Sequence, residues 1–235
     1  MNAPAILKEL KALGSEGVKK IFLNHGIKEP LFGVKVGDMK KIQKRIKKDH
    51  QLALELFDTG NYDAMYLAAL ISDDAKMTRK DLNHWVEKAN CGPLAAVPVP
   101  WVTVGSPHGI EMAREWIASK KELVACAGWE TLGGLVSVKP DAELDLAELR
   151  RLLQRVQQSI HQQPNRVRSA MNHFVIAVGS YVAPLTDLAI QTGEKIGEVL
   201  VDVGDTACTV PYSPDFIRTV KKRGTIGKKR KTVKC

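Results

Sequence analysis

The chain has 235 residues, of which 44% are apolar and 26% are charged, a composition typical of a globular protein rather than a disordered or collagen-like one. It carries 35 Lys and Arg residues against 26 Asp and Glu residues, which gives a net charge of +9. No apolar run approaches the roughly 18 residues that a membrane span needs, and the cysteines form neither a CxxC nor a CxxH pair, so we expect no membrane segment, metal or cofactor.

Nearly all of the expected elements are helices whose apolar residues recur at helical spacing. In chain order they cover residues 5–13, 18–25, 39–48, 50–57, 62–71, 78–88, 108–118, 121–136, 144–161, 164–181 and 186–200. A turn-rich connection at 26–37 contains a short extended piece at 31–36. Four prolines between residues 91 and 107 predict a broken helix or a packed loop there.

These helices follow one another in pairs with short joints, which favours an all-α protein built from stacked helical hairpins. We therefore predict a single-domain α-solenoid of HEAT-like repeats over residues 1–217. A plain globular helical bundle is the alternative, since no repeat of the residues themselves is visible.

The remaining residues, 218–235, form a basic segment with nine Lys or Arg residues and no Asp or Glu. Subtracting it leaves 26 basic against 26 acidic residues, so the whole net charge lies in this segment. Concentrated charge of this kind indicates a polyanionic partner, and its glycines predict a flexible chain that follows a phosphate backbone. A solubilising terminus or a localisation signal is the alternative. Its candidate contacts are Lys221, Lys222, Arg223, Lys228, Lys229, Arg230 and Lys231.

A second basic cluster covers the polar surface of the helix expected at 39–48. Its candidate DNA contacts are Lys40, Lys41, Lys44, Lys47 and Lys48. A solvated helix surface is the alternative interpretation.

A third cluster, Arg166 and Arg168, lies in the first turn of a helix, where the electropositive terminus disfavours cations. An anion held by both the guanidinium groups and the helix N–H groups would explain their position. Two surface arginines bonded to acidic neighbours are the alternative.

Among the four tryptophans, Trp85, Trp116 and Trp129 fall in amphipathic helices and are predicted to lie in the core. Trp101 lies in the proline-rich stretch, where helix packing does not account for it. An aromatic ring in an irregular segment is able to stack on a base or sugar.

The segment FGVKVGDMKKIQKRIKKDHQLALELFDTGNYDAMYLAALISD, the stretch ending in Trp101, the stretch REWIASKKELVACAGWETL and the closing GKKRKTVKC together resemble the AlkD-like DNA alkylation repair family. The resemblance covers most of the chain. It implies a solenoid of HEAT-like repeats whose concave, basic face holds duplex DNA. Active members excise cationic alkylated purines without flipping the base, and other branches bind branched or distorted DNA without excision.

The family's pocket holds two tryptophans around an aspartate, with an arginine nearby. The resemblance implies that Trp101 occupies an aromatic position, that Gly105 replaces the aspartate, that Cys126 lies near the arginine position, and that His173 lies near the second tryptophan position. Trp101 and His173 are therefore candidate DNA contacts, as are Arg166 and Arg168. Glycine cannot stabilise the positive charge that develops on the sugar during base expulsion.

Our leading hypothesis is therefore a monomeric, cytoplasmic protein that binds duplex, branched or damaged DNA through its backbone and shape. It is expected to use no cofactor and, on balance, to lack catalysis. An active alkylpurine N-glycosylase with a relocated acid, for example Glu111 or Asp141, is the first alternative. A protein-binding helical scaffold is the second.

Overall fold

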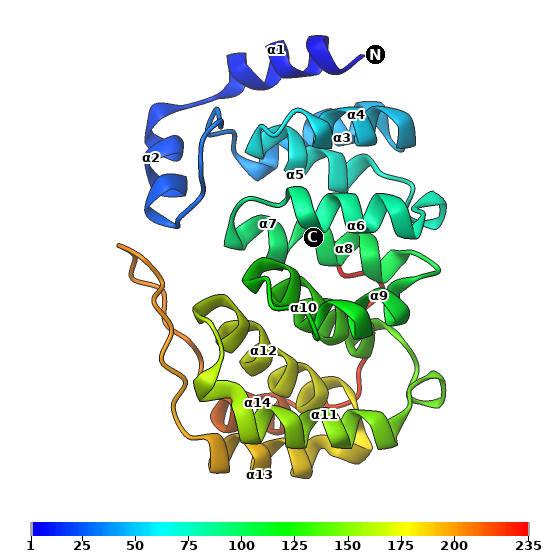
Figure 1. Ribbon diagram of the computed structural model, residues 1–235, viewed down its shortest axis with the longest axis vertical. Coiled ribbons are helices and arrows are strands. Elements are labelled where there is room, and N and C mark those ends of the chain that lie inside the picture. The colour runs from blue at the N-terminus through cyan, green and yellow to red at the C-terminus, as the bar shows by residue number, and fades with distance from the viewer. Residues whose placement is uncertain (1, 235) are drawn as a thin grey trace. The chain divides into compact units, whose positions relative to one another are not determined.

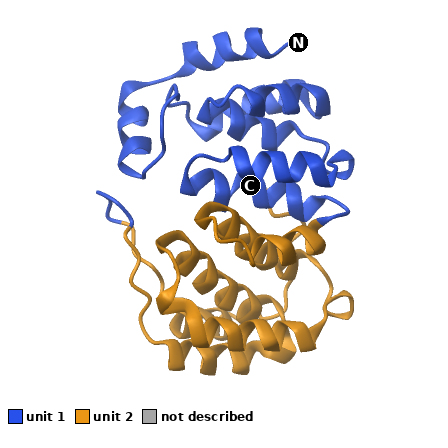
Figure 2. Cartoon of the chain, in the orientation of Figure 1, with its two compact units in different colours: residues 1–108, 203–207 blue, residues 109–202, 208–235 orange. Residues whose placement is uncertain are grey.

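The computed structural model describes residues 2–234. Helices are the only regular elements in this range (Figure 1), as the sequence predicts. The chain divides into two compact units (Figure 2). Unit 1 comprises residues 1–108 and 203–207, and unit 2 comprises residues 109–202 and 208–235.

Unit 1 contains the first eight α-helices and one short 3-10 helix. They are α1 (Ala3–Leu13), α2 (Glu16–Asn24), α3 (Val36–Ile46), α4 (His50–Asp58), α5 (Tyr62–Ile71), η1 (Asp74–Lys76), α6 (Arg79–Lys88), α7 (Gly92–Ala96) and α8 (Pro98–Gly105).

The α4–α5 hairpin is the centre of unit 1. Asp49 caps α4 by accepting a hydrogen bond from the Leu52 amide at 3.1 Å, and Asn61 caps α5 in the same way. Every residue of α5 is buried, which explains why this helix shows almost no polar side in the sequence. The ring of Phe57, at the end of α4, stacks on Trp85 of α6 with centroids 3.9 Å apart.

The proline-rich stretch is helical, which corrects the expectation of an irregular segment. Pro98 and Pro100 are the first and third residues of α8, where the backbone N–H groups have no partner within the helix. Proline therefore removes no hydrogen bond there, and its fixed φ suits the first turn. The break between α7 and α8 is confined to Val97.

Unit 2 contains the remaining helices. They are α9 (Gly109–Trp116), α10 (Glu122–Val138), η2 (Asp141–Glu143), α11 (Leu146–Ser159), η3 (Ile160–Gln162), α12 (Asn165–Tyr181), η4 (Ala183–Leu185), α13 (Thr186–Ile196) and α14 (Ser213–Lys222).

The helices α10 and α12 lie side by side, run in the same direction and form the core of unit 2. Trp129 of α10 is 1% exposed and packs on Phe174 of α12, with ring centroids 5.2 Å apart. The Arg155 guanidinium of α11 lies 5.4 Å from the centre of the Trp129 ring, and it donates a 2.7 Å hydrogen bond to the Ile117 carbonyl. Trp85 and Trp116 are 0% and 2% exposed, so the predicted core role of all three tryptophans is confirmed.

The C-terminal region differs most from the sequence-based expectation. The helix predicted at 186–200 ends at Ile196, and α14 was not predicted at all. Its three buried or half-buried apolar residues, Pro214, Ile217 and Val220, are interrupted by charged residues, which hid the pattern behind the basic composition. The boundary proposed at residue 218 falls inside α14.

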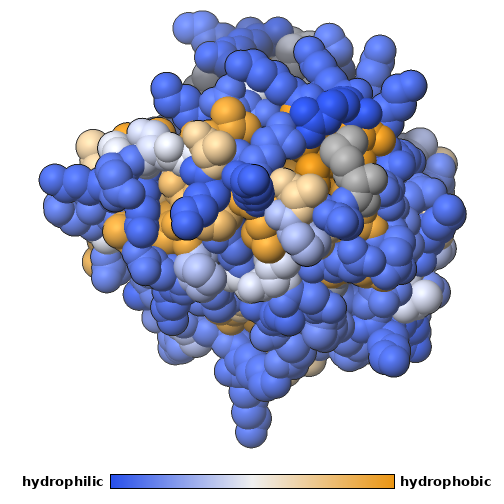
Figure 3. Space-filling model, turned by 90° about the horizontal axis from the view of Figure 1, so that it is seen from above, coloured by the Kyte–Doolittle hydropathy of each residue, from blue (hydrophilic) through white to orange (hydrophobic). Residues whose placement is uncertain are grey.

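The surface seen in Figure 3 is mostly hydrophilic, with apolar areas between hydrophilic side chains. Within residues 2–234, no single helix is long and apolar enough to cross a membrane. The segments 165–181 and 183–196 are long and apolar enough only when taken together, and the chain bends by 117° between them.

Candidate nucleic-acid interface

A buried carboxylate fixes the loop that leads into α3. Asp63 of α5 is 0% exposed, and its oxygens accept hydrogen bonds from the backbone amides of Phe32, Gly33 and Val34 at 2.6, 3.2 and 2.8 Å. Three N–H donors compensate the desolvation of one carboxylate. The loop, which was predicted to be extended at 31–36, is thereby held on α5, and the start of α3 is held with it.

Half of the basic residues on α3 and its C-terminal end are neutralised by protein carboxylates. Lys41 lies 2.8 Å from Asp38, and this hydrogen bond lowers the pKa of the aspartate. The other pairs are Arg45 with Glu9 of α1, and Lys48 with Asp73. These pairs support the interpretation as a solvated surface for Lys41 and Lys48.

Lys40, Lys44 and Lys47 differ from these, because none has an acidic partner among the residues that the structure describes. Lys40 and Lys44 lie one turn apart on α3, and Lys47 is the C-cap residue that follows the helix. The helix ends at Ile46, two residues earlier than predicted, and Lys47 adopts a φ of 64°. We call these three residues the lysine row.

Trp101 is 9% exposed and packs edge-to-face on Tyr66, with ring centroids 5.5 Å apart. The ring is therefore a packed helix side chain rather than an open stacking platform, which corrects the expectation for this residue. Gly105, the last residue of the same helix, lies against the side chain of Asp74. A Cβ atom at position 105 would come within 2.5 Å of Asp74 Oδ2 and 2.8 Å of Asp74 Cβ.

Asp74 is a residue that the sequence reasoning missed. It is 31 positions from Gly105 in the chain, so no local motif links the two. Its carboxylate accepts a 2.6 Å hydrogen bond from the Ser72 hydroxyl. The space left by the missing side chain at position 105 is thus filled by a carboxylate from η1.

The start of α12 receives a carboxylate from the protein itself. Glu122, in the first turn of α10, accepts a 2.7 Å hydrogen bond from the Arg166 amide. At the Arg166 amide, the Glu122 carboxylate therefore occupies the position in which an external anion was expected. Arg168 donates a 3.4 Å hydrogen bond to Asn165, and its buried Nε has no hydrogen-bond partner.

Burial raises the pKa of the neighbouring Cys126 thiol well above its ordinary value, which keeps it protonated and unreactive.

His173 is a half-exposed residue of α12 whose Nδ1 lies 2.8 Å from Glu130 Oε1 on α10. The negative charge of Glu130 raises the pKa of His173, outweighing the opposing effect of desolvation. His173 is therefore protonated over a wider pH range than a free imidazole.

The basic segment is anchored to unit 2, which corrects the prediction of flexibility. The amide of Gly227 donates to the Ser180 carbonyl at 2.9 Å, and the amide of Arg230 donates to the Ser137 carbonyl at 2.8 Å. The ammonium group of Lys229 reaches the Val136 carbonyl near the C-terminus of α10 at 2.8 Å and pairs with Asp141 at 2.8 Å. Asp141, which we weighed as a relocated acid, is thus engaged by Lys229.

The two glycines that indicated flexibility instead form fixed turns. Gly224 and Gly227 have φ values of 66° and 76°, a region that residues with side chains rarely enter. Lys221 pairs with Asp187, but Lys222, Arg223, Lys228, Arg230 and Lys231 have no acidic partner within residues 2–234.

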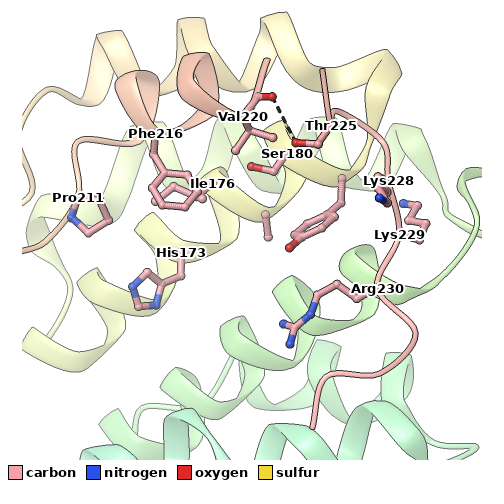
Figure 4. Close-up of a pocket in the computed structure, with 12 residues that line it drawn as sticks. His173, Ile176, Ser180, Pro211, Phe216, Val220, Thr225, Lys228, Lys229 and Arg230 are labelled. Carbon is pink, nitrogen blue, oxygen red and sulfur yellow. Dashed lines mark hydrogen bonds between the residues drawn. The ribbon is translucent and has the colours of Figure 1, made fainter. Parts of the chain in front are cut away.

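The fold brings His173 and residues 225–230 of the basic segment to one pocket in unit 2 (Figure 4). The pocket has a volume of about 610 Å³ and lies between α12, α14 and residues 225–230. His173, Lys228, Lys229 and Arg230 line it, all of them predicted DNA contacts. The lysine row and Trp101 belong to unit 1. Within the described range, no cluster of His, Cys, Asp or Glu is arranged to hold a metal ion.

Comparison with known proteins places this geometry in context. Residues 6–198 match the model of a family described as DNA alkylation repair enzyme. The uncharacterized protein Lin0241 of Listeria innocua is 32% identical over 220 residues, which is 92% of this chain and 95% of the relative. The uncharacterized protein Lmo0209 of Listeria monocytogenes is 31% identical over the same shares.

A solved structure covers the whole length. It is described as "a new family of proteins related to the HEAT-like repeat DNA glycosylases with affinity for branched DNA structures". The two chains are 36% identical, each is covered completely, and the TM-score is 0.92. The predicted all-helical, HEAT-like fold is confirmed by this similarity.

Proposed function

Because the chain belongs to the DNA alkylation repair enzyme family, we propose that it is a DNA-binding protein that recognises branched or distorted DNA by backbone and shape. The observation that carries the proposal is the full-length similarity, at 36% identity, to a structure whose family is described as having affinity for branched DNA. At this identity and coverage, the fold is shared along the whole chain.

The charges of the two units support the same proposal. The lysine row on unit 1 and five cations of the basic segment on unit 2 have no carboxylate partner among the described residues. Unpaired Lys and Arg side chains bind phosphates and release condensed counterions, a sequence-independent source of affinity. Selectivity among DNA structures then comes from which phosphates these cations reach at the same time.

Excision of alkylated purines is a second candidate function, and one observation favours it. Gly105 lacks the carboxylate that the family resemblance implies, but Asp74 fills the space above it. A carboxylate beside the sugar stabilises the positive charge of base expulsion, and losing such a preorganised group costs roughly 10²–10³-fold in rate. If the protein is a glycosylase, we propose Asp74 as its acid, in place of Glu111 or Asp141.

The test of DNA binding is a titration of linear duplex, single strand, three-way junction and four-way junction of equal length at several salt concentrations. We expect tighter binding to the junctions than to the duplex. We also expect a log–log salt slope of roughly −4 to −5, as for about five phosphate contacts. A slope near zero would exclude binding through phosphate contacts, and equal affinity for linear duplex and junctions would exclude shape-dependent recognition of DNA.

The excision test uses duplex containing one alkylated purine with protein in excess. Base release that is abolished in Asp74→Asn supports the second candidate, and no release by the wild type removes it.

A monomeric state and a cytoplasmic, DNA-associated location also belong to this proposal. Sedimentation in the presence and absence of DNA checks the first of these. A scaffold that binds only proteins would give no DNA binding in any arm of the titration.

A further inference from the structure

The pocket in unit 2 contains groups that the fold leaves without partners. The hydroxyl of Ser180, on α12, has no hydrogen-bond partner although the residue is only 4% exposed. Ser180 is one of the residues that line the pocket (Figure 4). A buried hydroxyl that makes no hydrogen bond is costly, so a polar atom of a ligand would satisfy it.

An aromatic ring faces the same space. Phe216, on α14, is 46% exposed, which is unusual for a large apolar side chain in a helix that otherwise packs on the core. Ile176 and Val220 continue the apolar wall beside it. This wall offers a flat, uncovered surface to a ring that stacks or lies against it.

Cations line the side of the pocket formed by the basic segment. Lys229 is neutralised by Asp141, but Lys228 and Arg230 have no acidic partner among the described residues. In Figure 4, Arg230 and His173 both lie below Phe216 and Ser180 in the view. An anionic group bound there would meet fixed positive charge, because the backbone of this segment is anchored to Ser137 and Ser180.

We propose that this pocket receives one unpaired nucleotide of DNA, and this inference rests on the proposed function. The base lies against Phe216 and Ile176, a polar atom of the nucleotide bonds to the Ser180 hydroxyl, and the adjoining phosphate binds Lys228 and Arg230. The volume of about 610 Å³ is sufficient for a base and its sugar. A bulge or an incompletely paired branch point supplies such an unpaired nucleotide, whereas a fully paired linear duplex does not.

The test compares three DNAs of equal length: a linear duplex, the same duplex with one unpaired purine, and the same bulge carrying an abasic residue. Wild type should prefer the unpaired purine over the abasic residue by about 5- to 100-fold, the range expected for one base stacked on an aromatic ring. Phe216→Ala should remove this preference. Ile110→Ala is the control, because Ile110 is also an exposed apolar residue but does not line this pocket.

A second pair of variants separates the pocket from the overall charge. Lys228→Ala with Arg230→Ala should reduce the preference for bulged over linear DNA by at least about fivefold, as expected when roughly one phosphate contact is lost. Lys222→Ala with Arg223→Ala removes the same charge from the same segment outside the pocket. This control should weaken binding to both DNAs equally.

Ser180→Ala provides a variant that leaves the apolar wall unchanged and should still reduce the preference. Thermal unfolding confirms that each variant is folded. A mononucleotide should compete with the bulged DNA more effectively than with linear duplex. If wild type binds junctions but does not distinguish purine from abasic bulges, or if Phe216→Ala keeps the preference, the pocket inference is wrong and DNA binding stands. If no DNA binds, the proposed function itself fails.

Discussion

Replacing the lysine row, Lys40, Lys44 and Lys47, by alanine should reduce both the affinity for DNA and its salt dependence. These three cations have no acidic partner among the described residues, so each is available to a phosphate. Each phosphate contact contributes about 0.9 to the log–log salt slope, so the triple variant should lose about 2.7 of it. A slope contribution of about 0.9 corresponds to roughly eightfold in affinity per contact for a tenfold change in salt. Taking the three contacts to contribute nothing to affinity at about 1 M salt, the triple variant should bind DNA up to roughly 500-fold more weakly than wild type near 0.1 M salt.

The matched control replaces Lys41, Arg45 and Lys48, which neighbour the lysine row. It removes the same net charge, but each of these cations is already bound to a carboxylate of the protein. The control should therefore change the slope by less than one phosphate contact, about 0.9. Fluorescence anisotropy of a labelled three-way junction at several salt concentrations measures both slopes. An unchanged slope in the triple variant, or an equal loss in the control, would refute the assignment of the lysine row to phosphate binding.

Three further predictions follow from particular contacts. Asp63→Ala should lower the free energy of unfolding by about 3–5 kcal/mol in denaturant titrations, because it leaves three amides of the loop before α3 without their acceptor; Asp63→Ala with the stability of wild type would contradict this. Glu130 raises the pKa of His173, so the part of DNA affinity due to the imidazolium should be complete at low pH and disappear as the pH rises through that raised value. Glu130→Gln should move this loss to lower pH, because only the lowering effect of desolvation remains, and an NMR titration of His173 that shows no shift would exclude the pair as the cause. Gly105→Ala should destabilise the protein by about 1–3 kcal/mol, because the added Cβ meets Asp74. Adding Asp74→Ala should restore most of that loss in the free energy of unfolding. Additive losses in the double variant would show that the two residues do not compete for space.

The sequence by itself determined the helices that have a clear apolar side and a local start signal. Thr78 illustrates this, since its side chain and that of Asp81 form a capping box that needs only neighbouring residues. The core positions of Trp85, Trp116 and Trp129 likewise follow from periodicity within their own helices. The net charge and its concentration in residues 218–235 depend on composition alone.

Tertiary structure decided which of these residues are available to a partner. Lys41 and Lys44 have the same chemistry and nearly the same position, but only Lys41 is paired, because the backbone places Asp38 one turn before it. The basic segment is ordered because carbonyls near the ends of α10 and α12 accept its amides, and those carbonyls are distant in the chain.

The relation between Asp74 and Gly105 and the pocket that joins Ser180, Phe216 and Arg230 have the same origin. Each depends on residues from separate helices that meet only after the helices pack. Periodicity and caps act over a few residues, so they fix which segments are helices and which side of each is buried. Pairing, occlusion and pocket formation depend on contacts between distant segments, and only the packed structure specifies them.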